Sequence, residues 1–215
     1  FGTVIAFFLA LLFVFLRIQT FDRVDNDLTR FFKSIGRGFA TVYSTIVRGT
    51  PMMVQGLLIY YAGFTVLRSM GFETAQANQI WSTFTAGLVT ISLNSTAYMM
   101  EVLRGGIESI PRGQYEAAQV LGYTKAQTFF KIILPQMVKR VIPAVTNEVI
   151  TLVKDTSLAS VIGTVEMFTR AKQIVASPNT PGMLALVAAG VFYYVFNYVV
   201  AFAMEKWEQA LRYYR

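Results

Sequence analysis

Five apolar segments constrain the fold more than any other feature of the sequence. They cover residues 1–16, about 38–67, Thr83–Leu103, about 136–153 and Met183–Met204. A helix needs roughly 20 apolar residues to cross the hydrocarbon core of a bilayer. Only 14% of the residues are charged, against about 25% in a soluble domain. We therefore predict an all-α integral membrane protein with five spans, folded as one domain over residues 1–215.

The first segment is apolar but has neither the charged start nor the small-residue cleavage site of a signal peptide. The chain opens on Phe1 rather than Met. We therefore expect it to begin inside a longer protein and to hold only the end of a truncated first span. The second segment is interrupted by the run Arg-Gly-Thr-Pro at residues 48–51.

The net charge of +7 has two explanations, nucleic-acid binding or basic cytoplasmic loops. If the spans alternate in direction, 14 of the 19 basic residues fall on one side: Arg17, Arg23, Arg30, Lys33, Arg37, Arg104, Arg112, Lys125, Lys131, Lys139, Arg140, Lys206, Arg212 and Arg215. Lys and Arg accumulate in cytoplasmic loops, so this side is predicted to be cytoplasmic. The C-terminus then lies in the cytoplasm, and topology explains the charge without nucleic acid as a partner.

The sequence lacks the residues that most enzyme and metal sites need. It contains no Cys and no His, which excludes disulfides, Ser/His and Cys/His catalytic pairs, and the commonest metal ligands. It also has no GxxxxGK[ST] loop to hold ATP phosphates. We expect no enzyme activity, no metal and no cofactor in this chain, and any energy must come from a partner.

The stretch EAAQVLGYTKAQTFFKIILP, residues 116–135, lies between the third and fourth predicted spans. Gly122 suits the end of a first short helix because glycine tolerates a positive φ there. A second helix over residues 126–133 then leads to Pro135, a residue favoured where a helix starts. The alternative is an ordinary amphipathic helix lying on the membrane surface.

The spacing of this stretch resembles the EAA loop of bacterial ABC importer permeases. The runs at residues 48–55, 92–118 and 134–160 are similar to the polar amino acid branch of that family. The resemblance implies a five-span type I importer permease fold with a cytoplasmic coupling loop at about 111–135. In the family this loop docks on a separate ATPase and transmits its closure. The positions carried over are Gly113, Glu116, Ala117, Ala118, Gly122, Leu134 and Pro135.

The resemblance also implies a location and partners. The location is the bacterial cytoplasmic membrane, with lipid around the spans. The partners are two copies of an ABC ATPase that binds ATP and Mg, a second permease subunit (identical or homologous), and an extracellular or periplasmic amino acid binding protein. The implied activity is import of a polar amino acid by alternating access.

Three alternatives remain. The same machinery could carry another small solute, such as cystine or an opine-like compound. A passive pore has no use for a docking loop, and a scaffold or intramembrane enzyme is disfavoured by the missing nucleophile–base pairs.

Polar side chains inside the predicted spans are the candidate pathway residues: Gln55, Asn94, Ser95, Tyr98 and Glu148. Such residues are costly in hydrocarbon and commonly functional, although hydrogen bonding between helices is the alternative role. By resemblance, Glu148 would meet a cationic group of the substrate, and Asn94 and Gln55 its polar ends.

A second polar set follows helical spacing at the cytoplasmic end of the third span. Glu101, Arg104 and Glu108 stand at i, i+3 and i+7. Side chains at these positions lie on one helix face and can form ion pairs. We predict a structural charge ladder there.

Overall fold

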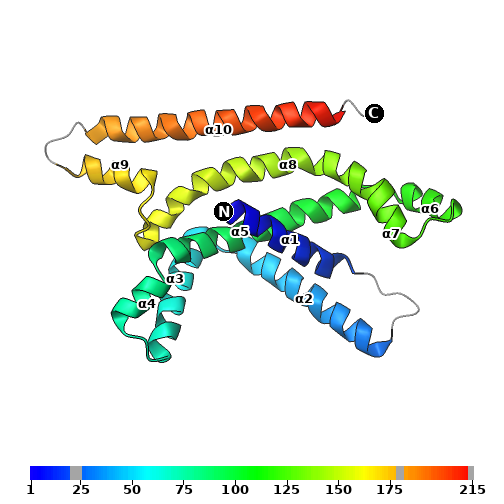
Figure 1. Ribbon diagram of the computed structural model, residues 1–215, viewed down its shortest axis with the longest axis horizontal. Helices are drawn as coiled ribbons and strands as arrows, with labels where there is room; N and C mark the ends of the chain where they lie inside the picture. Colours follow the sequence, from blue (N-terminus) through cyan, green and yellow to red (C-terminus); the bar gives the residue numbers. More distant parts are fainter. Residues whose placement is uncertain (20–25, 178–181, 213–215) are drawn as a thin grey trace.

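The computed structural model describes residues 1–19, 26–177 and 182–212, and it contains helices and no strand over these residues. The helices are α1 (Gly2–Ile18), α2 (Asp27–Gly49), α3 (Met52–Ser69), α4 (Thr74–Ile80), α5 (Thr83–Glu108), α6 (Arg112–Val120), α7 (Lys125–Thr128), α8 (Leu134–Asp155), α9 (Met167–Val175) and α10 (Gly182–Arg212) (Figure 1). A π-helix, Phe129–Ile133, joins α7 to α8, and a 3₁₀ segment, Thr156–Ile162, follows α8. The all-α prediction is confirmed.

Helix α5 forms the centre of the molecule and contacts α1, α2, α3 and α8. The core lies where these helices cross and contains Met99, Met100 and Leu103 of α5 packed against α1, α2 and α8. Gly106 permits the close approach of α8, since a Cβ at this position would lie 2.1 Å from Cγ1 of Val141. Helix α10 runs along the outside of the molecule against α8 and α9 (Figure 1).

The second predicted span is not one helix. Helix α2 begins at Asp27, well before residue 38, where the Asn26 side chain accepts a hydrogen bond from the Thr29 N–H at 2.9 Å. The chain then bends by 113° between α2 and α3. Proline forces the preceding residue into an extended conformation, and Thr50, before Pro51, has φ −121° and ψ 146°. The expected interruption at residues 48–51 is therefore a sharp corner.

By length and hydropathy alone, one of the helices in the described ranges could cross a bilayer by itself, α10 over Gly182–Ala210, with a mean hydropathy of 1.9. The pair α2 and α3 qualifies only if the two bent helices count as one span, and α1 is apolar but has 17 residues. The predicted third and fourth spans correspond to α5 and α8, which carry polar side chains among their apolar ones. Many polar residues of α5 are buried against neighbouring helices, which explains how a span can contain them.

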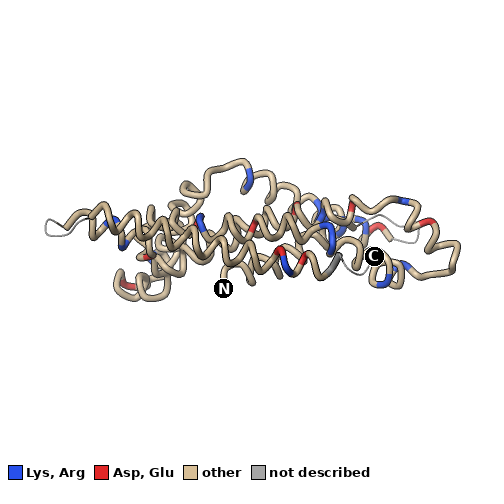
Figure 2. The backbone as a smooth tube through the Cα atoms, turned by 90° about the horizontal axis from the view of Figure 1, so that it is seen from above, with Lys and Arg blue, Asp and Glu red and all other residues tan. Residues whose placement is uncertain are grey.

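The two ends of the long axis differ in charge. The last turns of α1, α5 and α10 lie at one end together with α6 and α7, whereas α4 and the 3₁₀ segment lie at the other (Figure 1). Lys and Arg gather at the end that carries α6 and α7 (Figure 2). Two members of the predicted basic set, Arg23 and Arg215, lie outside the described residues. The rest of the set supports the predicted separation of charge.

Candidate functional site

The segment between α5 and α8 folds as two short helices joined by a glycine turn, as predicted. Helix α6 ends at Val120, and Gly122 follows the Leu121 cap with φ +76°. The Gly122 N–H donates to the Gln119 carbonyl at 3.0 Å, and the Tyr123 N–H donates to the Ala118 carbonyl at 3.0 Å. This pair of bonds is a Schellman motif, which needs a left-handed residue at the position that Gly122 occupies.

The second helix continues into α8 without a break. Thr124 and Gln127 form a capping box at its start, in which the Thr124 N–H donates to Gln127 Oε1 at 2.9 Å. The expected helix over residues 126–133 is present, but its second half, Phe129–Ile133, is a π-helix in which the Leu134 N–H bonds to the Phe129 carbonyl. Pro135 explains this widening: it has no N–H, and its ring crowds the carbonyl four residues earlier.

The coupling segment, defined as residues 111–135, exposes most of the predicted contact positions. Gly113, Glu116, Ala117, Gly122 and Pro135 are exposed, Leu134 is half-buried and Ala118 is fully buried. Glu116 makes no hydrogen bond or ion pair with any residue that the structure describes. Its carboxylate is therefore available to a partner.

Two apolar residues at the end of α6 were not among the predicted contact positions. Val120 is 88% exposed and Leu121 is 73% exposed. Neighbouring apolar side chains with this exposure mark an interaction surface when polar groups surround them. They lie at the end of α6, directly before the Gly122 turn, with their side chains in solvent.

Gln55 and Asn94, two of the predicted pathway residues, bind each other. Asn94 Nδ2 donates to Gln55 Oε1 at 3.0 Å, and Gln55 Nε2 donates to the Val47 carbonyl at 2.7 Å and to Thr50 Oγ1 at 2.8 Å. Gln55 therefore ties α3 to the end of α2 across the corner and to α5. These hydrogen bonds explain how the chain satisfies its backbone groups at the bend.

The other three pathway residues surround the next part of α5. Ser95 of α5 lies near the Glu148 carboxylate of α8. Tyr98 lies one turn further along α5 and is 38% exposed, with the Arg48 guanidinium 5.7 Å from its ring centre. Asn94 and Ser95 are buried, whereas Gln55, Glu148 and Tyr98 are partly accessible. All five residues lie on α5 or on the helices beside it.

The predicted charge ladder on α5 is confirmed. Arg104 binds Glu101 at 2.9 Å through Nε and Glu108 at 2.5 Å through Nη1. The structure adds partners that sequence spacing could not reveal, because they come from other helices. Arg17 of α1 forms an ion pair with Glu101, and Ser44 of α2 donates to it at 2.7 Å. Glu101 therefore joins α1, α2 and α5. Within the described ranges, no cluster of acidic residues could hold a metal ion.

Comparisons with known proteins agree with this arrangement. Residues 28–213 match the family described as "Binding-protein-dependent transport system inner membrane component". An arginine transport system permease protein of Bacillus subtilis is 37% identical over 174 residues, which cover 80% of this chain and 74% of that protein. A glutamine transport system permease protein of Escherichia coli is 34% identical over 178 residues, covering 83% and 77%. A solved amino acid ABC transporter, crystallised with histidines, matches with a TM-score of 0.78 and 28% identity, covering 97% of this chain and 86% of that one.

The cornered second span, the central polar helix and the two-helix segment between α5 and α8 define the type I fold of an ABC importer permease. The chain belongs to the family of binding-protein-dependent transport system inner membrane components. Its place is therefore a bacterial membrane, and its partners are in general an ATPase and a substrate-binding protein. The resemblance drawn from the EAA-type spacing is confirmed.

Proposed function

We propose that this chain is the permease subunit of an importer that moves a polar amino acid into a bacterial cell by alternating access. The observation that carries the proposal is the coupling segment itself. It places the unpaired carboxylate of Glu116 and the exposed side chains of Val120 and Leu121 at the ends of the two inner helices, α5 and α8.

The coupling segment is suited to dock on a separate ATPase that binds ATP and Mg. Burying Val120 and Leu121 against a partner would contribute roughly 1.5–3 kcal/mol each. Glu116 would pair with a basic residue of the ATPase. Helix α7 continues through the π-helix into α8, which packs on α5 at Gly106. A displacement of the docked segment therefore passes to both inner helices.

The same proposal includes the assembly and the orientation. Two permease chains, identical or homologous, would meet around a two-fold axis, and each would dock one of two ATPase copies. Helix α10 offers an exposed apolar surface to lipid or to a second permease, because only 6% of its 18-residue apolar stretch is buried within the chain. The basic end that carries the coupling segment would face the cytoplasm, together with the C-terminus.

The substrate class follows from the pathway residues and from the named relatives. Proteins that transport arginine and glutamine are 37% and 34% identical to this chain, so we propose a polar amino acid. Glu148 and Tyr98 would contact it, while Gln55, Asn94 and Ser95 hold the corner and α8 in place. A passive pore is not favoured, because it would not need the coupling segment.

A reconstituted importer tests this proposal. The permease, its ATPase and its binding protein are placed in proteoliposomes, and amino acid uptake and ATP hydrolysis are measured together. Glu116→Lys should abolish most substrate-stimulated hydrolysis and uptake, because it reverses the charge offered to the ATPase. Glu205→Lys on α10 is the matched control, since Glu205 is also exposed but lies outside the coupling segment. Normal uptake by the Glu116→Lys importer would contradict the docking role.

A further inference from the structure

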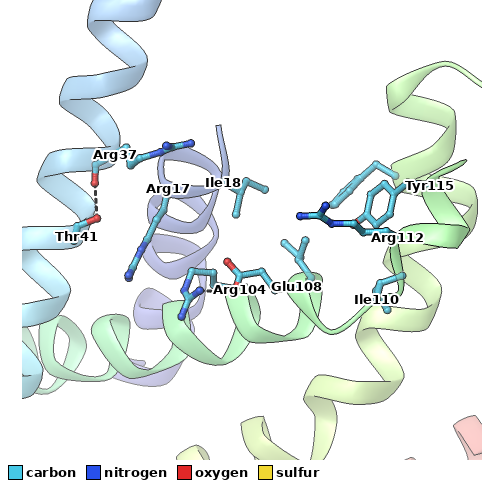
Figure 3. Close-up of a pocket in the computed structure, with 11 residues that line it drawn as sticks. Arg17, Ile18, Arg37, Thr41, Arg104, Glu108, Ile110, Arg112 and Tyr115 are labelled. Carbon is cyan, nitrogen blue, oxygen red and sulfur yellow. Dashed lines mark hydrogen bonds and ion pairs between the residues drawn. The ribbon is translucent and has the colours of Figure 1, made fainter. Parts of the chain in front are cut away.

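A cavity of about 810 Å³ lies between the coupling segment and the adjoining helix ends. Arginines from four helices line it: Arg17 of α1, Arg37 of α2, Arg104 of α5 and Arg112 of α6 (Figure 3). Four guanidinium groups from separate elements at one cavity are unusual, because like charges repel unless an anion lies between them. Negative charge must therefore balance the arginines at this cavity.

Carboxylates within the chain balance part of this charge. Glu101 pairs with Arg17 and with Arg104, and Glu108 pairs with Arg104. Among the described residues that line the cavity, one carboxylate, Glu108, stands against four arginines, and Glu101 beside the cavity pairs with two of these arginines. The lining is thus cationic even after its internal ion pairs are counted.

Arg112 is the arginine without an internal partner. It forms no ion pair or hydrogen bond with any residue in the described part of the chain. In Figure 3 its side chain extends from α6 into the space in front of Ile18 and Glu108. An anion in the cavity would meet this guanidinium directly.

A second, mostly apolar groove of about 630 Å³ lies beside the cationic cavity. Ile18, Tyr115 and Phe129 line both spaces, so the two share a wall. Further along the groove, Phe15 and Phe130 form its wall and are 60% and 65% exposed. One ligand that fits both parts has an anionic head and an apolar tail.

The cavity lies at the expected depth for a lipid head group. The predicted span of α5 ends at Leu103, Arg104 follows directly, and Glu108 stands about one turn later. Basic pockets at the cytoplasmic ends of transmembrane helices bind anionic lipid head groups. The side of the membrane rests on the orientation given under Proposed function.

We propose that this cavity and groove bind one anionic phospholipid of the cytoplasmic leaflet. Its phosphate lies against Arg112 and the other arginines, and an acyl chain follows Phe15 and Phe130. The lipid bridges α1, which carries Phe15, to the coupling segment, which carries Arg112 and Phe130. The anionic lipid content of the membrane would then affect how firmly the coupling segment is held.

Lipid binding to the whole importer tests the proposal. The complex is purified from nanodiscs that contain phosphatidylcholine and phosphatidylglycerol, and the bound lipids are counted by native mass spectrometry. Wild type should retain phosphatidylglycerol in preference to phosphatidylcholine. Arg112→Gln should weaken that retention about fivefold, because a cation near an anionic surface contributes roughly 1 kcal/mol. Phe130→Gln should weaken it by removing an exposed wall of the groove.

Arg30→Gln is the matched control. Arg30 lies on α2 at the same end of the molecule, is exposed, and does not line the cavity, so this variant should retain phosphatidylglycerol like wild type. Equal retention of phosphatidylglycerol by Arg112→Gln and wild type would overturn the proposal. So would equal retention of phosphatidylglycerol and phosphatidylcholine by wild type. Displacement of the bound lipid by soluble glycerol phosphate would assign the cavity to a free anion instead.

The readout is bound lipid, which separates this proposal from the docking role. If the wild-type importer shows no lipid preference but takes up substrate normally, only the lipid site is ruled out. If wild type prefers phosphatidylglycerol but the Glu116→Lys importer transports normally, only the docking role is ruled out.

Discussion

Replacement of Gly122 by alanine isolates the contribution of one backbone conformation to coupling. Gly122 has φ +76°, and no atom lies within 4 Å of a Cβ built there, so the change introduces strain without a clash. The left-handed conformation costs an L-residue roughly 1–2 kcal/mol, and alanine's smaller unfolded-state entropy offsets roughly 0.4–1 kcal/mol. The net destabilisation of the α6 end is therefore about 1 kcal/mol.

A change of this size is measurable in two assays. Since 1.4 kcal/mol corresponds to a factor of ten, amide hydrogen exchange at the end of α6 should accelerate about fivefold. Uptake per ATP hydrolysed should fall in the reconstituted importer, because a frayed α6 transmits less of the ATPase movement. Gly122→Asn should be milder, since asparagine visits the left-handed region more readily than alanine.

Gly113→Ala is the control on the same helix. Gly113 has no positive φ, and a Cβ there also meets no atom within 4 Å. Alanine at this position should stabilise α6 by roughly 0.5–1 kcal/mol. Equal hydrogen exchange and equal coupling in wild type and Gly122→Ala would refute the reasoning, as would an equal acceleration of hydrogen exchange at the end of α6 in Gly113→Ala.

Three further predictions concern the inner helices α5 and α8. Glu148→Gln keeps the shape of the side chain and removes its charge, so it should reduce uptake of a cationic amino acid more than that of a neutral one, while basal ATP hydrolysis persists. Uptake is measured with labelled arginine and glutamine, and an equal effect on both would rule out the pathway role of Glu148. Gly106→Ala should lower the melting temperature of the permease and destabilise it by roughly 1–3 kcal/mol, because its Cβ would lie 2.1 Å from Val141; an unchanged melting temperature would show that α5 and α8 separate easily. Glu101→Gln should destabilise the fold by roughly 1–3 kcal/mol, since it leaves Arg17 without its carboxylate, and a thermal melt similar to wild type would show that Glu101 does not hold α1, α2 and α5 together.

The coupling segment was the part of the site most accessible from sequence, because its determinants are local. A glycine that ends a helix acts within a few residues, and so the turn at Gly122 followed from the spacing alone. The π-helix at Phe129–Ile133 is also a local effect of Pro135, but the sequence signal of a proline near a helix start does not distinguish a new helix from a widened turn. A helix forms here as predicted, but its hydrogen bonds follow the π pattern over Phe129–Ile133.

Long-range partners were beyond sequence reasoning. The ladder of Glu101, Arg104 and Glu108 was predictable because its members share one helix face, whereas Arg17 is 84 residues from Glu101. Likewise, the pattern singled out Gln55 and Asn94 as polar residues in apolar surroundings, yet their mutual hydrogen bond depends on the 113° corner between α2 and α3. Pro51 marks the position of the corner in the sequence, but neither the size of the angle nor the contacts of α2 and α3 with α5 can be read from a local pattern.

The most direct test of the docking role uses the absence of cysteine from the chain. Ala117→Cys introduces a unique thiol at an exposed position of α6, and Ser69→Cys introduces one at the exposed end of α3, on the opposite side of the molecule. A short thiol-reactive cross-linker is added to the assembled importer in membranes, and the products are identified by mass spectrometry. The account predicts a cross-link from Ala117→Cys to the ATPase and none from Ser69→Cys. No cross-link from Ala117→Cys, or an ATPase cross-link from Ser69→Cys, would contradict it.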